Sequence, residues 1–316
     1  RCEVEVDNSS YLKASQNGQI LYSIADEGVV AFRVLSNGSL ARLNSANIRG
    51  MRGCHLSTSK ADDYIFISGF HDGKITVLNL NKDGAVGQIA DGVFHKGLGS
   101  VAERSFRPHV SCSRLTPDER FLMVADLGID QIKVYRFDHK DGKITLVDTI
   151  RCELESAPKY FMFSSDGRFF YVLYELKNTI DVFSYKEGER VPVVEKIQTI
   201  SSTGTAPNQL TAACAIRFSS DEKHLFCSNA GDDTVSIYKR DEETGLLELI
   251  CCLPISGEYP KDIAIFPDDQ HIASLNHETG SITFFHIDYE KGLLVGSANP
   301  VRVDEPNCCA IVKVRG

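Results

Sequence analysis

The chain has 316 residues, of which 42% are hydrophobic, so it is long enough to bury a large core. Its formal net charge of −9 argues against general nucleic-acid binding, which needs a basic surface. No apolar run reaches the length of a membrane span, and no basic stretch followed by an apolar one marks a signal peptide at the start of the sequence. We therefore expect a cytoplasmic protein that binds neither nucleic acid nor membrane.

Ten cysteines are spread along the chain. The adjacent pairs Cys251-Cys252 and Cys308-Cys309 are poorly placed for ordinary disulfides, and a chain of this length does not need a disulfide framework. No CxxC pair or His-x-x-x-His pair stands out as a zinc site. The pattern predicts reduced thiols and no bound metal.

One pattern of strands and turns recurs along the sequence, and residues 109–138 show it most clearly. They read as a short strand, a polar turn, an apolar strand, a second turn and a strand of alternating character, and residues 143–150 supply a fourth strand. The first turn occurs six times, about 44 to 57 residues apart. Its copies lie at 15–18, 59–62, 116–119, 164–167, 219–222 and 266–269.

An apolar strand follows each of these turns, at 20–25, 64–69, 121–126, 169–174, 224–229 and 271–276. Alternating strands such as 74–78 and 234–238 come next. The long segments 93–107 and 201–211 exceed an ordinary connection and are candidate rim loops. Repeated units of four antiparallel strands are typical of a β-propeller.

The two ends of the chain indicate a seventh unit. Residues 306–314 read as an inner strand, and residues 1–6 read as the outer strand that closes the same blade. Two middle strands are missing, so either this blade is incomplete or an N-terminal segment is absent from the sequence, which we favour. We predict one all-β domain over residues 1–316, a seven-bladed propeller of four-stranded blades whose seventh blade combines both termini.

The turns also set a register between blades. Six equivalent positions at the start of the first strand are Ser10, Cys54, Ser111, Lys159, Cys214 and Lys261. A second set, at the end of the apolar strand or directly after it, includes Asp126, Glu175, Asn229 and His277. In a propeller these two places share one face, so we expect both sets to line the mouth of the central channel and to bind the ligand there.

With its repeats aligned, the sequence resembles the seven-bladed propeller lactonases, which include bacterial 6-phosphogluconolactonases and fungal carboxy-cis,cis-muconate lactonising enzymes. The resemblance runs over nearly the whole chain. Its motifs are residues 8–12, 53–57, 94–95, 107–110, 124–128, 157–160, 174–176, 228–231 and 259–262. It implies hydrolysis of a small anionic sugar lactone in carbohydrate metabolism, in the pentose phosphate pathway, by a monomer or weak homo-oligomer without a cofactor.

Several family positions differ in this chain. The family's Pro-His-x-His has Ser111 in place of its second His, and its Ser-Asn-Arg-Gly has Ala230 in place of Arg. Its two Pro-Arg-His motifs carry Lys159 and Lys261 in place of Arg. Lys cannot reproduce the two-pronged hydrogen bonding of Arg, so these changes bear on the substrate. The family's Asn-Glu-Leu keeps its acid as Glu175.

Lactone hydrolysis needs a base that activates water and a positive charge where the oxyanion forms. We hypothesise that Glu175 is the base, that Lys159 assists the oxyanion and that His109 carries protons. Substrate contacts are assigned to Lys261 and Arg104 as anchors for phosphate or carboxylate, and to His95, Asp126, Asn229 and His277.

Simpler interpretations stay open at this point. Glu175 and Lys159 form a structural ion pair in one of them, and His109 only ties a strand. The rim cysteines Cys54, Cys214, Cys308 and Cys309 are apolar filler or a metal site, and Asp26, Asp126 and Asp262 together hold Ca²⁺. For the whole protein the alternatives are a non-catalytic propeller that binds a metabolite or protein, and a muconate-type lactonising isomerase.

Overall fold

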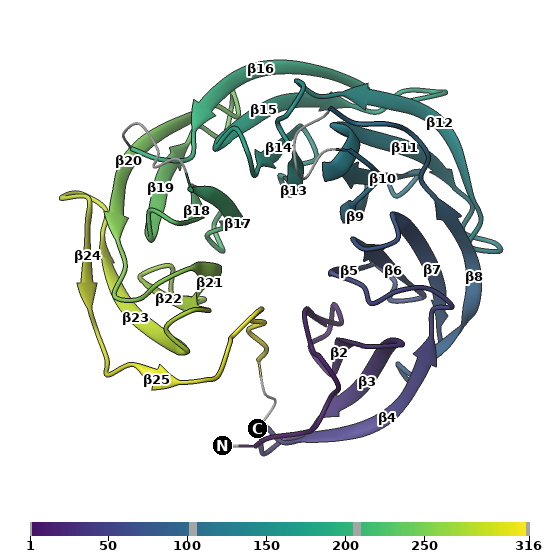
Figure 1. Cartoon of the computed structure of the whole chain (residues 1–316), viewed down its shortest axis with the longest axis horizontal. Coiled ribbons are helices and arrows are strands. Elements are labelled where there is room, and N and C mark those ends of the chain that lie inside the picture. The colour runs from purple at the N-terminus through teal and green to yellow at the C-terminus, as the bar shows by residue number, and fades with distance from the viewer. Residues whose placement is uncertain (1, 101–105, 205–209, 314–316) are drawn as a thin grey trace. The chain divides into compact units, whose positions relative to one another are not determined.

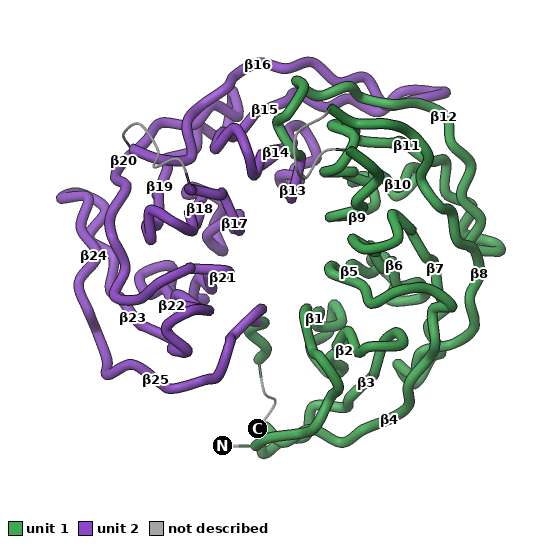
Figure 2. Tube along the Cα trace, in the orientation of Figure 1, with its two compact units in different colours: residues 1–157, 310–316 green, residues 158–309 purple. Residues whose placement is uncertain are grey.

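In the computed structural model, the described chain comprises residues 2–100, 106–204 and 210–313. It folds into two compact units (Figure 2). Unit 1 contains residues 1–157 and 310–316, and unit 2 contains residues 158–309. Each unit holds three antiparallel sheets, which we number as blades 1 to 6 in chain order (Figure 1).

Unit 1 contains blades 1, 2 and 3. Blade 1 is β1 (Leu12–Ala14), β2 (Ile20–Ala25), β3 (Gly28–Val34) and β4 (Leu40–Asn47). Blade 2 is β5 (His55–Thr58), β6 (Tyr64–Gly69), β7 (Lys74–Leu80) and β8 (Val86–Phe94). Blade 3 is β9 (Val110–Leu115), β10 (Phe121–Asp126), β11 (Gln131–Phe137) and β12 (Ile144–Arg151), with a short 3-10 turn η1 (Leu127–Ile129) after β10.

Unit 2 contains blades 4, 5 and 6. Blade 4 is β13 (Pro158–Phe163), β14 (Phe169–Tyr174), β15 (Thr179–Lys186) and β16 (Val193–Ser201). Blade 5 is β17 (Ala212–Phe218), β18 (His224–Ala230), β19 (Thr234–Arg240) and β20 (Leu247–Pro254). Blade 6 is β21 (Pro260–Ile265), β22 (His271–Asn276), β23 (Ser281–Asp288), β24 (Leu293–Gly296) and β25 (Val301–Arg302).

The repeated turn is built by its hydroxyl residue. In blade 4 the hydroxyl of Ser164 donates to Asp166 at 2.6 Å and accepts the N–H of Phe169, the first residue of β14, at 3.1 Å. Thr116 and Ser219 do the same in blades 3 and 5. A Ser or Thr two residues before an Asp or Asn therefore closes the turn and starts the second strand. All six apolar strands begin at the predicted residues.

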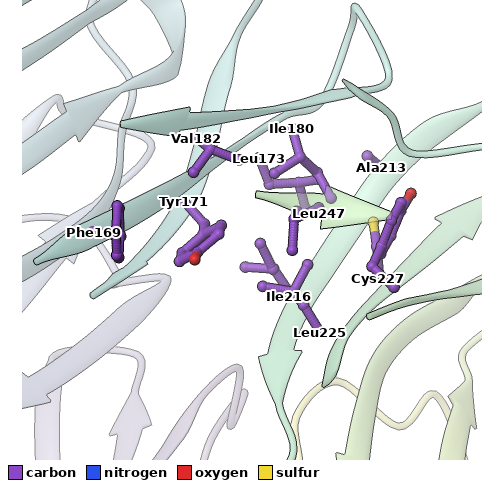
Figure 3. Packing of buried hydrophobic residues seen from close by; sticks show 11 residues of the cluster. Phe169, Tyr171, Leu173, Ile180, Val182, Ala213, Ile216, Leu225, Cys227 and Leu247 are labelled. Atoms are coloured by element: carbon purple, nitrogen blue, oxygen red, sulfur yellow. The ribbon is translucent and has the colours of Figure 1, made fainter. Parts of the chain in front are cut away.

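The apolar strands form cores between neighbouring blades of the same unit. In unit 2, Tyr171 and Leu173 of blade 4 pack with Ile216, Leu225 and other residues of blade 5 (Figure 3). Blades 2 and 3 of unit 1 share a similar cluster, as do blades 5 and 6 of unit 2. Each fully buried side chain of this size contributes about 1.5–3 kcal/mol.

A second contact between blades is polar and repeats within each unit. In unit 2 the backbone N–H of Ser165 donates to the carboxylate of Glu222 at 2.9 Å, and the N–H of Ser220 donates to Asp269 at 2.5 Å. In unit 1, Gln16 and Lys60 bond in the same way to Asp62 and Glu119. All four acidic residues have a positive φ between 51° and 56°, which aims each carboxylate at the preceding turn.

We predict that this inter-blade bond stabilises unit 2. Glu222→Ala removes the acceptor of the Ser165 N–H and hydroxyl, and is expected to lower the free energy of unfolding by about 1 to 2 kcal/mol. Denaturant unfolding measures the change. Glu195→Ala, at an exposed site on β16, is the control and should stay within about 0.5 kcal/mol of the parent. Equal stability of the two variants would contradict the prediction.

The strands predicted at the two ends of the chain are absent from the described residues there. Residues 2–6 and 303–313 carry no strand, and the outer edge of blade 6 is made of the separate strands β24 and β25. A strand needs a neighbour for its backbone hydrogen bonds, and the described ends lack the two middle strands of a seventh blade. The single domain over residues 1–316 stays a prediction.

None of the ten cysteines forms a disulfide. Within the described residues, no helix is long and apolar enough to cross a membrane.

Candidate active site

The inner strands have an irregular backbone pairing at most of the predicted register positions. In β13, Pro158 pairs with Tyr174 and Tyr160 pairs with Leu173, so Lys159 between them is an unpaired bulge residue. Ser111 of β9, Cys214 of β17 and Lys261 of β21 occupy the same irregularity in their strands. A β-bulge bends its strand and redirects a side chain, and bulges are frequent next to active sites. Four of the six register positions are therefore structurally equivalent.

The chain just before two of these bulges has a strained backbone conformation. Ala157 and Tyr259 both have a φ of 58° and precede Pro158 and Pro260. A carboxylate from the preceding blade accepts each backbone N–H: Asp130 that of Ala157 at 2.8 Å, and Asp233 that of Tyr259 at 2.7 Å. These bonds fix the chain just before Lys159 and Lys261. Positive φ at residues other than glycine costs about 1–3 kcal/mol and is concentrated at functional sites.

Lys159 and Glu175 form the central pair of unit 2. The ammonium nitrogen of Lys159 lies 2.7 Å from Oε2 of Glu175, which follows the end of β14 in the same blade. The side chains are 21% and 8% exposed. Burial lowers the pKa of Lys159, whereas the charge of the Glu175 carboxylate and its hydrogen bond raise it, and the pKa lies above the usual lysine value. Lys159 is therefore a fixed positive charge at neutral pH.

Cys214 borders this pair from blade 5. Its sulfur lies 3.8 Å from the Lys159 nitrogen. Burial raises the pKa of the thiol, with a smaller opposing effect from Lys159, so Cys214 is a neutral thiol at physiological pH. Among the described residues, no group of three His, Cys, Asp or Glu side chains is arranged to hold a metal ion.

Lys261 continues the site into blade 6. Its ammonium donates to the side-chain carbonyl of Asn307 at 2.5 Å. The neighbouring Asp262 is buried, pairs with Arg217 of β17 at 2.6 Å, and accepts the N–H of Cys309 at 3.1 Å. The carboxylate of Asp262 is thus committed to Arg217, whereas Lys261 donates to a neutral amide.

Two predicted substrate residues of unit 2 have different settings. Asn229 is fully buried and its amide donates to the carbonyl of Ser202 at 2.8 Å, a structural role that leaves it closed to a ligand. His277 is half-buried, and its backbone N–H donates to the carbonyl of Tyr259 at 2.9 Å. The ring centres of Tyr259 and His277 are 5.9 Å apart.

Two of the predicted histidines, His95 and His109, belong to unit 1. The Nδ1 atom of His95 lies 2.7 Å from Asp126, and both side chains are closed to solvent. Burial lowers the pKa of His95 despite this carboxylate, so the imidazole is neutral at pH 7. His109 donates its backbone N–H to Asp126 at 2.8 Å, stacks on Phe70 with ring centres 4.3 Å apart, and contacts the Phe70 carbonyl through Nδ1. These contacts support the simpler interpretation, in which His109 ties a strand.

Two expectations from the sequence remain. Arg104, the predicted anchor beside Lys261, lies outside the described residues. Asp26, Asp126 and Asp262, the proposed Ca²⁺ ligands, each have a separate polar partner: the amide of Asn8, the ring of His95 and the guanidinium of Arg217.

A family model described as lactonase, seven-bladed β-propeller, matches residues 2–311. The chain belongs to this lactonase family. The predicted fold class and enzyme class are thereby confirmed. Among curated relatives, the 6-phosphogluconolactonase of Bacillus subtilis is 27% identical over 312 residues, which cover 96% of this chain and 87% of the relative.

Solved structures agree with this lactonase fold. A Bacteroides fragilis protein, provisionally assigned as a 6-phosphogluconolactonase, is 31% identical with a TM-score of 0.87, and the match covers 97% of this chain and 87% of that chain. The periplasmic gluconolactonase of Pseudomonas aeruginosa has a TM-score of 0.91 at 22% identity, over 99% and 90% of the two chains. At that identity the likeness shows the fold alone.

Several residues that hold the backbone or a lysine side chain were missed from the sequence. Asp130 and Asp233 gave no signal, because a carboxylate after a strand is common and its partner lies about 26 residues away along the chain. Asn307 lies in the segment predicted as a strand. Tyr259 was visible within a family motif, but only its positive φ marks it as unusual.

Proposed function

We propose that unit 2 of this lactonase carries the residues that open an anionic sugar lactone by hydrolysis. The observation that supports this most is the 2.7 Å contact between Lys159 and Glu175, because it places a carboxylate and a permanent cation side by side. The bulge at Lys159 and the 21% exposure of its side chain leave the ammonium partly accessible from solvent.

In this proposal Glu175 takes a proton from the attacking water as the water oxygen bonds to the lactone carbonyl carbon. The carbonyl oxygen gains negative charge in that step. Lys159 is the nearest fixed positive charge and stabilises this oxyanion. The raised pKa of Lys159 suits an electrostatic role, because an ammonium that holds its proton firmly stays charged throughout the reaction.

Lys261 is proposed to bind the phosphate or carboxylate of the substrate. Its nitrogen is oriented by Asn307, and its inner-strand position is equivalent to that of Lys159. A compact ammonium binds a phosphate as a point charge, without the two-pronged geometry of Arg. We also propose, from the relative of Bacillus subtilis and the unbridged thiols, a cytoplasmic role in sugar-phosphate metabolism.

The substrate is tested by initial rates on freshly generated 6-phosphogluconolactone and on unphosphorylated gluconolactone, each corrected for spontaneous opening. Lys261→Ala is expected to raise KM for the phosphorylated lactone about 10- to 100-fold, the value of one hydrogen bond to a charged group. KM for the neutral lactone should change less than about twofold.

Lys291→Ala, at an exposed site of blade 6, is the control and should leave both KM values unchanged. An equal change of KM on the two lactones would contradict the role of Lys261. If the parent protein accelerates neither lactone above its spontaneous opening, the proposed function is wrong.

A further inference from the structure

The last segment of unit 2, residues 303–309, brings a side chain to the inner strand of blade 6. After β25 the chain turns back from the outer edge of the blade toward β21 (Figure 1). Two backbone bonds hold the segment: the N–H of Val303 donates to the carbonyl of Gly280 at 3.1 Å, and the N–H of Cys309 donates to Asp262 at 3.1 Å. The segment is therefore fixed at both ends, although it forms no strand.

Asn307 lies between these two bonds and contacts Lys261 of β21. Pro306 before it is buried, whereas Asn307 and Lys261 are both half-buried and so reach solvent in part. Glu305 has a φ of 41°, in the left-handed region that residues other than glycine rarely adopt. Backbone strain of this kind is concentrated at functional sites, so the placement of Asn307 calls for an explanation.

The chemistry of this contact fixes the orientation of the Asn307 amide. The ammonium nitrogen of Lys261 lies 2.5 Å from Oδ1 of Asn307, and an ammonium can only donate hydrogen bonds. The amide oxygen therefore faces Lys261. The NH₂ group is bonded to the same carbon, so it lies next to the contact with two N–H donors of its own. The bond between the two side chains uses one of the three ammonium donors and none of the amide donors.

The two bulge lysines of unit 2 have different kinds of partner. Lys159 bonds to the carboxylate of Glu175, which balances its charge. Asn307 accepts a hydrogen bond from Lys261 but brings no negative charge to it. The contact between Lys261 and Asn307 thus keeps a net positive charge and places N–H donors of two residues side by side. Donors on a positively charged pair are suited to binding an oxyanion.

We propose that Lys261 and Asn307 form one phosphate subsite, in which Asn307 is a specificity-determining residue that binds the substrate directly. This rests on the proposed function, where Lys261 is the anchor of the anionic group. The ammonium donates to one phosphate oxygen, and an amide N–H of Asn307 donates to a second. A guanidinium offers two such bonds alone and a single ammonium does not, so the amide supplies the second prong. The subsite selects a phosphorylated sugar lactone over a neutral one.

Two substitutions of Asn307 test this role. Asn307→Ala is expected to raise KM for freshly generated 6-phosphogluconolactone about 10- to 100-fold, the value of one hydrogen bond to a charged group, and to leave KM for gluconolactone within about twofold. Asn307→Asp keeps the oxygen that accepts from Lys261 but replaces the N–H donors with a negative charge. Its melting temperature should match that of the parent, and KM for the phosphorylated lactone should rise at least as far. Asn299→Asp makes the same change at an exposed site of unit 2 and should leave both KM values unchanged.

A binding measurement tests the subsite without catalysis. Titration calorimetry with 6-phosphogluconate and with gluconate gives Kd for each variant. Asn307→Ala should weaken binding of 6-phosphogluconate about 10- to 100-fold and change binding of gluconate less than about twofold. Because Lys261 orients the amide, Lys261→Ala/Asn307→Ala should bind 6-phosphogluconate within about threefold of Lys261→Ala alone.

The outcomes separate a phosphate ligand from a side chain that only ties the segment down. If Asn307→Ala or Asn307→Asp binds 6-phosphogluconate as tightly as the parent, or if Asn307→Ala loses affinity equally for both acids, the inference is wrong. If the parent opens the lactone and the Asn307 variants keep its KM, only this inference fails. If the parent binds 6-phosphogluconate through both residues but opens no lactone, the subsite stands and the proposed hydrolysis fails.

Discussion

Glu175→Gln is expected to lower kcat for lactone opening by about 10²- to 10⁴-fold, the usual contribution of a positioned general base. The amide has nearly the shape of the carboxylate but cannot take a proton from water. KM should change little, because the proposed anchor for the anionic group is Lys261. Initial rates on freshly generated lactone, corrected for spontaneous opening, measure the effect.

Glu195→Gln is the matched control for this substitution, since it makes the same chemical change at an exposed site on β16 of the same unit. It should retain the kcat of the parent. A Glu175→Gln variant that is folded and opens the lactone within about threefold of the parent rate would remove Glu175 from the mechanism.

Lys159→Met is expected to destabilise the protein and to abolish activity. Glu175 is only 8% exposed, and removal of its cation leaves a carboxylate poorly solvated in the blade. Breaking a buried pair in this way costs about 3–5 kcal/mol. Because Lys159 itself is 21% exposed, we expect a value near the lower end of that range. Denaturant unfolding measures it.

The double variant Lys159→Met/Glu175→Gln separates stability from catalysis. With both charges gone, neither is left without a partner, so most of the lost free energy of unfolding should return. Activity should not return, because the base and the oxyanion charge are both absent. A pair that is only structural predicts the opposite: stability and activity would recover together.

The repeats were predictable because they depend on local chemistry. A hydroxyl residue such as Ser164 followed two residues later by Asp166 closes a turn by itself, and the apolar strand after it follows from composition. The register between blades also predicted that Ser111, Lys159, Cys214 and Lys261 occupy equivalent positions. That equivalence needed only constant spacing before each turn.

The contacts that hold the site were not predictable from the same pattern. Asp130 and Asp233 bind backbone N–H groups of the next blade, and nothing in the local sequence of a carboxylate indicates a partner so distant along the chain. Asn229 belongs to the same predicted set as Glu175 but is closed to solvent, which the register does not indicate. Register gives equivalent positions, whereas packing decides which of them a substrate can reach.

The prediction of strands at the two ends of the chain was wrong for a related reason. Residues 306–314 have the apolar pattern of an inner strand, but a strand also requires backbone pairing with a neighbouring strand, and the described part of that segment forms no such pairing. Asn307 instead binds Lys261, so this segment contributes to the site through a side chain.

The most direct test of the central claim is the rate of lactone opening by the stability-matched Lys159→Met/Glu175→Gln variant beside the parent, on freshly generated 6-phosphogluconolactone. If this pair in unit 2 is the catalytic centre, the parent will accelerate opening and the double variant, although folded, will leave the spontaneous rate unchanged. A folded double variant that opens the lactone as fast as the parent would contradict the claim and would place the reaction elsewhere in the protein.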